Sequence, residues 1–149
     1  MNSKNETDYV LGTHDAEIGR LHLQHGIWRE LVHDCWKRAG ISAGQRIIDI
    51  GCGPGFASVD LADIVGTDGA VIGIERSERF IDYAKGLSTA RAVENISFLQ
   101  ADVMLDELNV ADADAIWCRW LSIFVSDPAL LVQKMTAMLK PGGKLIFHE

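Results

Sequence analysis

A chain of 149 residues is long enough to bury one hydrophobic core, and its 48% apolar and 23% charged residues are ordinary for a globular protein. The formal net charge of −7, with no run of basic residues, argues against DNA, RNA or an anionic membrane as the main partner.

We expect neither a signal peptide nor a disulfide framework in this sequence. The polar stretch that follows Met1 lacks an apolar core, and no apolar run approaches the roughly 18 residues of a membrane span. The three cysteines, Cys35, Cys52 and Cys118, are far apart and odd in number, which fits reduced thiols better than disulfides or a zinc site. We therefore expect a cytoplasmic protein without a metal site.

Residues 1–43 are predicted to form a lead-in followed by an amphipathic helical segment. From Asp15 onward, certain side chains recur at alternating intervals of three and four residues, which places them on one helix face. These are Ile18, Leu21, His25, Trp28, Val32, Cys35 and Ala39. Gly26 is a candidate break between two helices, and Gly40 is the expected stop. The face is expected to pack on the domain or on another subunit.

From residue 44 to the end, short apolar strands alternate with helices. Strands are predicted over 46–50, 70–75, 96–100, 113–118 and 144–148. Helices are predicted over 56–65, 78–92 and 128 to about 139, with turns at 66–69 and 140–143. This alternation implies right-handed βαβ units, and therefore a doubly wound α/β domain with a parallel sheet. Such sheets bind ligands at the carboxyl ends of their strands.

The first of these strand ends carries a glycine-rich loop, Asp49-Ile50-Gly51-Cys52-Gly53-Pro54-Gly55. Glycines let a backbone turn sharply and approach a ligand closely, and the next helix offers free N–H groups at its start. A lone glycine pair would favour a simple tight turn. Three alternating glycines between a strand and a helix favour a ligand-binding loop.

Acidic residues follow at the ends of the second and third strands. Glu75 lies 24 residues after Gly51, close to the spacing at which a carboxylate accepts hydrogen bonds from ribose hydroxyls. Asp102 can accept the exocyclic amine of adenine while Val103 packs on the ring. The alternatives are a surface carboxylate for Glu75 and a turn-forming aspartate for Asp102.

Together these motifs resemble the class I S-adenosylmethionine-dependent methyltransferases. The resemblance rests on residues 49–55, Glu75, Ala101-Asp102 and Leu139-Lys140-Pro141-Gly142-Gly143, and it covers about residues 44–149. It implies a Rossmann-like sheet of strand order 3-2-1-4-5, S-adenosylmethionine as the cofactor, and methyl transfer to a small molecule.

The resemblance also implies roles for single residues. In that family the glycine loop, here Gly51, Cys52 and Gly53, lies against the methionine part of the cofactor. The residue that matches Glu75 holds the ribose, and Arg76 stands next to it.

Two further strand ends complete the implied site. The residues that match Asp102 and Val103 hold the adenine in the family, and the stretch that matches Cys118 and Arg119 passes beside the cofactor. A general base can assist when the acceptor carries a proton, and the candidates are His14, His148 and Glu149. No catalytic residue is assigned.

Other side chains are expected to shape the pocket rather than react. The N-terminal segment around Tyr9 and His14 is expected to close over it. Trp117, Trp120 and Phe124 could wall a substrate pocket, although burial in the core is the more common fate of such side chains.

Two other functions have to be weighed. A nicotinamide-dependent oxidoreductase would require Gly-x-Gly-x-x-Gly or Ala, whereas the third glycine here is Gly55 and Phe56 follows it. A non-catalytic, adenosylmethionine-binding or dimerising module is favoured by the chain end at Glu149, because the family usually continues with a helix and an antiparallel pair of strands. We expect a fragment or a reduced variant. We also expect it to dimerise through the edge strand 144–148 or the face Ile18–Ala39, or to aggregate.

Overall fold

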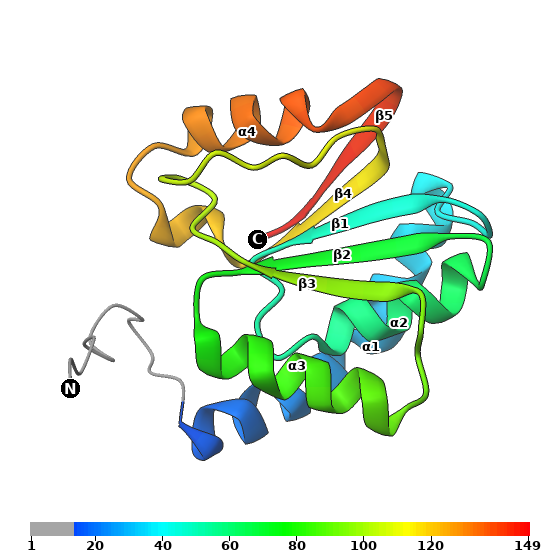
Figure 1. Cartoon of the computed structure of the whole chain (residues 1–149), viewed down its shortest axis with the longest axis vertical. Coiled ribbons are helices and arrows are strands. Elements are labelled where there is room, and N and C mark those ends of the chain that lie inside the picture. Colours follow the sequence, from blue (N-terminus) through cyan, green and yellow to red (C-terminus); the bar gives the residue numbers. More distant parts are fainter. Residues whose placement is uncertain (1–13) are drawn as a thin grey trace.

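A computed structural model describes residues 14–149, and Tyr9 therefore lies outside the described residues. In this part of the chain one five-stranded sheet has the order β3-β2-β1-β4-β5, and each neighbouring pair is parallel (Figure 1). The strands are β1 (Arg46–Ile50), β2 (Ala70–Glu75), β3 (Ile96–Gln100), β4 (Ala113–Arg119) and β5 (Leu139–His148). The predicted fold class and strand order are confirmed.

The helices cover both faces of the sheet. They are α1 (Asp15–Ala39), α2 (Phe56–Val65), α3 (Glu78–Ala90) and α4 (Pro128–Ala137), with a short 3-10 helix η2 (Ser122–Phe124). Figure 1 shows α1, α2 and α3 on one side of the strands and α4 on the other. This arrangement leaves the carboxyl edge of the sheet open to loops, including the glycine loop after β1.

Two apolar clusters follow from the alternation of side chains along each strand. On the first face, Val32 and Trp36 of α1 share a cluster with Leu61 of α2 and Trp117 of β4. On the second face, α4 packs on the strands in a cluster that includes Ile48, Ile74, Ile116, Leu131 and Met135. Helix α1 therefore contributes to the same core as the sheet.

Helix α1 differs from its prediction at Gly26, because it runs without a break from Asp15 to Ala39. A glycine inside a helix costs only about 1 kcal/mol, and the burial of Val32 and Trp36 outweighs that cost. Gly40 ends the helix as predicted, in the left-handed conformation with φ 84°.

The predicted face of α1 packs in part within the chain. Ile18, His25 and Val32 are buried, whereas Trp28 of the same face is exposed. The other exposed large apolar residues of α1 are Leu23, Ile27 and Leu31, which lie off the predicted face.

The last strand also begins earlier than predicted. Strand β5 starts at Leu139 and includes residues 140–143, which were predicted as a turn. Ala113 pairs with Leu139 and Ala115 pairs with Lys144, so the intervening residues bulge out of the ladder. The strand lies at an edge of the sheet, as expected. No helix in residues 14–149 combines the length and the apolar character needed to span a membrane.

Candidate functional site

Two cavities lie at the carboxyl ends of the strands. The first, of about 410 Å³, is lined by Glu75 and Asp102 among others, and we call it the Glu75 cavity. The second, of about 310 Å³, lies between the glycine loop and helix α1, and we call it the α1 cavity. Both are lined by Gly51, Arg119, Trp120 and Phe124, so the two cavities share a wall.

The glycine loop forms part of both cavities. The N–H groups of Gly51 and Cys52 both donate to the carbonyl of Ile74, which ties the loop to the end of β2. Gly51, Gly53 and Gly55 all have positive φ, a conformation that side chains disfavour. A Cβ on Gly53 would meet no atom within 4 Å, so the backbone there faces open space that a ligand can fill.

Glu75 is the most fully engaged carboxylate of the first cavity, and it is buried. Its Oε2 accepts from the N–H of Gly53 at 3.1 Å, and its Oε1 accepts from the N–H of Ser77 at 2.9 Å. Burial raises the pKa of Glu75, and these backbone N–H groups oppose that rise. Each carboxylate oxygen retains lone pairs that can accept hydrogen bonds from a diol.

The remaining predicted residues of the first cavity lie along one wall. Asp102 Oδ1 accepts from the N–H of Met104 at 2.8 Å, and Val103 is buried beside it. Arg76 is exposed, and its Nη1 lies 3.9 Å from Asp102 Oδ2. Glu75, Arg76, Asp102 and Val103 thus border one space, as the sequence motifs require.

The two cysteines predicted to lie in the cofactor site, Cys52 and Cys118, have different positions. Cys52 lines the α1 cavity, whereas the fully buried side chain of Cys118 belongs to the apolar cluster on the other face and lines neither cavity. Burial raises the pKa of Cys118 to about 12, so it stays an unreactive thiol at neutral pH. Of the pair Cys118-Arg119, only the arginine side chain reaches the cavities.

Asp49 is a second buried carboxyl group, and it lines the α1 cavity. Burial raises its pKa to about 7, against the hydrogen bond from Ser58 and the positive charge of Arg119. The Ser58 hydroxyl donates to Asp49 Oδ2 at 2.6 Å. A proton on this carboxyl is therefore gained or lost near neutral pH.

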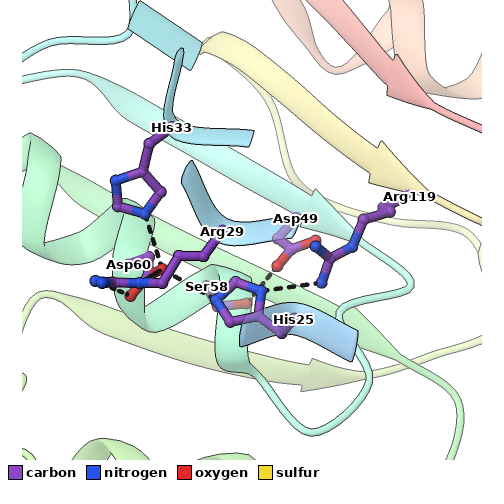
Figure 2. A network of polar contacts seen from close by, with 7 residues as sticks. All are labelled: His25, Arg29, His33, Asp49, Ser58, Asp60 and Arg119. Atoms are coloured by element: carbon purple, nitrogen blue, oxygen red, sulfur yellow. Dashed lines mark hydrogen bonds and ion pairs between the residues drawn. The ribbon is translucent and has the colours of Figure 1, made fainter. Parts of the chain in front are cut away.

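A polar network joins α1, α2 and the end of β4 (Figure 2). Asp60 Oδ2 of α2 accepts hydrogen bonds from three side chains of α1: His25 Nε2 at 3.0 Å, Arg29 Nε at 2.8 Å and His33 Nε2 at 2.8 Å. Burial alone would raise the pKa of Asp60, but the hydrogen bonds from these three side chains hold it well below its usual range. On its other side, His25 Nδ1 accepts from Arg119 Nη2 at 3.2 Å.

Sequence reasoning missed this network and the contribution of α1 to the site. Arg20, Leu21 and Gln24 line the α1 cavity, although only Leu21 had been singled out, as part of a packing face. A signal was present, because His25 lies in that apolar face and a buried histidine requires polar partners.

The candidate bases and the aromatic residues also have defined positions. His14 is exposed just before the start of α1, and none of His14, His148 and Glu149 lines either of the two cavities. The ring of His148 lies within 5.1 Å of Trp120 and 6.0 Å of Trp117, measured between centroids. Trp117, Trp120 and Phe124 all line the α1 cavity, the less favoured of the two expected positions, and Trp117 is at the same time buried in the first apolar cluster.

Comparison with known proteins bears on this geometry. A family profile described as a methyltransferase domain matches residues 41–149, which is most of the chain. The chain belongs to the methyltransferase domain family. The glycine loop, Glu75, Asp102 and Arg119 all lie within the matched part.

The curated relatives of this methyltransferase-family chain are longer than the chain itself. A demethylmenaquinone methyltransferase of Lactococcus lactis subsp. lactis is 32% identical over 126 residues, which cover 85% of this chain and 49% of that protein. A ubiquinone biosynthesis O-methyltransferase of Coxiella burnetii is 34% identical over 105 residues, which cover 70% of this chain and 43% of that protein. The chain spans about half the length of such relatives.

Solved structures share the fold. A methyltransferase from Aquifex aeolicus has a TM-score of 0.71 at 23% identity, covering 77% of this chain and 61% of that one. Coclaurine N-methyltransferase, bound to N-methylheliamine and SAH, has a TM-score of 0.74 at 24% identity, with coverages of 80% and 35%. The [4+2]-cyclase SpnF also matches, with a TM-score of 0.70 at 25% identity and coverages of 79% and 43%. The fold therefore carries more than one chemistry.

Proposed function

We propose that this chain is the cofactor-binding part of an S-adenosylmethionine-dependent methyltransferase that acts on a small molecule. The observation that carries the proposal is the position of Glu75. It accepts from the Gly53 N–H and borders the Glu75 cavity, so one carboxylate joins the glycine loop to the space beside it.

The residues present fit the cofactor in shape and chemistry. The open space at Gly53 accommodates an amino-acid chain close to the backbone. Glu75 offers acceptors to the ribose hydroxyls, and Asp102, with Val103 beside it, offers an acceptor and an apolar surface to adenine. Gly51 and Arg119 border both cavities, where the two halves of such a ligand would join.

When bound, S-adenosylmethionine supplies an electrophilic methyl group on a sulfonium. This chain's own residues would hold the acceptor in line and exclude water, which is catalysis by proximity and orientation. Trp117, Trp120 and Phe124 give the α1 cavity aromatic walls suited to a flat acceptor ring. The quinone-pathway names of the relatives agree with such an acceptor.

Ligand-induced stabilisation tests the proposal. S-adenosylmethionine and S-adenosylhomocysteine should raise the melting temperature in proportion to the logarithm of their concentration, because they bind the folded state only. NAD should not raise it. If NAD stabilises the chain and S-adenosylhomocysteine does not, the chain is a dinucleotide-binding protein and the proposal fails.

The cellular setting is part of the proposal. The three cysteines are unpaired, and Cys52 and Cys118 are buried, as suits a reducing cytoplasm. The acidic net charge of −7 continues to disfavour nucleic acid as a partner. A homodimer is proposed only through the edge of β5, where Phe147 is exposed.

A further inference from the structure

The side chain of Arg119 is a cation at the shared wall of both cavities. Burial lowers its pKa and the charges of Asp49 and Asp60 oppose that shift, but within residues 14–149 neither these carboxyls nor any other forms a direct ion pair with it. The Nη2 of Arg119 donates to His25 Nδ1, an uncharged acceptor, and its Nη1 is buried with no hydrogen-bond partner in the same part of the chain. A buried N–H group of this kind is costly unless a ligand supplies the acceptor that it lacks.

The surroundings hold this guanidinium in one orientation. Its central carbon lies 4.7 Å from the centre of the Trp120 ring, a cation–π contact that adds to the hydrogen bond between Nη2 and His25. Trp120 has φ 51°, a left-handed conformation that large side chains rarely adopt. Strain of this kind next to a cavity is a mark of a functional position.

His25 connects Arg119 to the polar network. Arginine can only donate, so the Nδ1 of His25 must accept, and the ring proton must lie on Nε2, which donates to Asp60. Asp60 is itself fixed by Arg29 and His33. Figure 2 shows His25 between Asp60 and Arg119, so the three side chains form one line from α2 to the cavity wall.

We propose that Arg119 binds a carboxylate of the ligand, and that His25 and Asp60 are positioning residues that aim it. The proposal rests on the proposed function, since a bound sulfonium adds positive charge nearby and two such cations need an anion. A planar guanidinium edge suits a carboxylate, which it can bind with two parallel hydrogen bonds. The carboxylate can belong to the amino-acid part of the cofactor or to an acidic acceptor.

Calorimetric titration with two adenosine ligands separates these sources. S-adenosylhomocysteine carries the amino-acid carboxylate, whereas 5′-methylthioadenosine has the same adenosine and lacks it. If the cofactor supplies the carboxylate, Arg119→Gln should weaken the binding of S-adenosylhomocysteine about tenfold to a hundredfold. The affinity for methylthioadenosine should stay within about twofold of the wild-type value. If the acceptor supplies it, both ligands keep their affinity, and binding of the probe benzoate to protein saturated with S-adenosylhomocysteine is lost.

The positioning roles are tested on α1. His25→Leu should weaken the affinity for the same ligand that Arg119→Gln affects, by about threefold to tenfold, because Arg119 loses its fixed orientation. His25→Asn should recover most of the affinity, since an amide oxygen can stand where Nδ1 stood. Arg38→Gln, an exposed arginine of the same helix paired with Asp34, is the control and should change nothing.

Three results would overturn the inference in distinguishable ways. If Arg119→Gln alters neither adenosine ligand nor benzoate, Arg119 does not bind a carboxylate. If His25→Leu remains folded and keeps the affinity for the ligand that Arg119→Gln weakens, then His25 and Asp60 do not position Arg119. If the wild-type chain binds neither adenosine ligand, the proposed function fails, and benzoate alone still reports on Arg119.

Discussion

The two cavities share a wall but are built from different parts of the sequence. The Glu75 cavity takes its polar groups from the ends of successive strands, so Glu75 and Asp102 are placed by the sheet itself. The α1 cavity takes Arg20 and Gln24 from a helix that precedes the sheet, and Asp49 from strand β1. Local motifs therefore determine the first cavity, whereas the second depends on long-range packing.

The largest difference between the cavities should appear in their titration behaviour. The pKa of Asp49 in the folded chain is about 7, against an ordinary value of 3.8. As pH rises, the Asp49 carboxyl loses its proton at a lower pH in the unfolded chain than in the folded chain. The free energy of unfolding should therefore fall between about pH 4 and 7, by about 4 kcal/mol. Asp49→Asn, which mimics the protonated carboxyl, should remove most of this loss.

Urea unfolding at several pH values checks this expectation. The difference in stability between Asp49→Asn and the wild type should grow as pH rises from 5 to 8. Burial also raises the pKa of Glu75, so a smaller decline should remain in the variant. Parallel curves for the two proteins would show that Asp49 ionises normally and that its burial is relieved by solvent.

Two glycines of the same loop should respond differently to one added methyl group. A Cβ on Gly55 would lie 2.8 Å from the Cβ of Ala84 in α3, whereas a Cβ on Gly53 would meet open space. Gly55→Ala should therefore lower the free energy of unfolding by about 3 kcal/mol, from overpacking and the left-handed backbone together. Gly53→Ala should cost about 1 kcal/mol, for the backbone alone.

Ligand binding should show the opposite order for these glycines. The Gly53 methyl group would occupy space proposed for the cofactor, so its affinity for S-adenosylhomocysteine should fall although the chain stays folded. Gly55→Ala should affect the free energy of unfolding more than the affinity for S-adenosylhomocysteine. Equal losses of stability in the two variants would mean that α3 moves away readily from the loop.

Glu75 should contribute to ligand binding through its carboxylate. Glu75→Ala removes the proposed ribose acceptor and leaves two backbone N–H groups without partners, so S-adenosylhomocysteine should bind about 1–3 kcal/mol more weakly. The affinity of Glu75→Gln should lie between those of the wild type and Glu75→Ala, because the amide oxygen can still accept from one of the two backbone N–H groups. The matched control is Glu78→Ala, an exposed glutamate at the start of α3 that lines neither cavity. Calorimetry that finds Glu75→Ala and Glu78→Ala alike would remove Glu75 from the site.

The sequence predicted the sheet and the Glu75 cavity because their signals are local. Strand ends, glycines and acidic residues follow each other at short spacings, and parallel strands bring their carboxyl ends together. Even the missed bulge in β5 lies next to a correctly predicted strand core.

The contribution of α1 to the second cavity could not be predicted because its contacts span long separations. Arg119 and His25 are 94 positions apart, and His25 and Asp60 are 35 apart, so no motif joins them. The periodicity of α1 gave the buried face but not the element it packs on. The same limit explains Gly26, since tertiary burial on either side of it overrides a weak local preference.

The smallest effect is expected at Arg76, which the family resemblance places in the site. Its side chain is 45% exposed, and its ion pair with Asp102 spans 3.9 Å, a geometry that contributes little in water. Arg76→Ala should therefore change the affinity for S-adenosylhomocysteine by less than about fivefold, and added salt should reduce even that difference. Arg119→Gln, measured in the same titration, is the comparison, because the Nη1 of Arg119 is buried without a partner and its Nη2 is held by His25. If Arg76→Ala has the larger effect on this ligand, the decisive cation belongs to the Glu75 cavity, and the contrast between the two cavities is wrong.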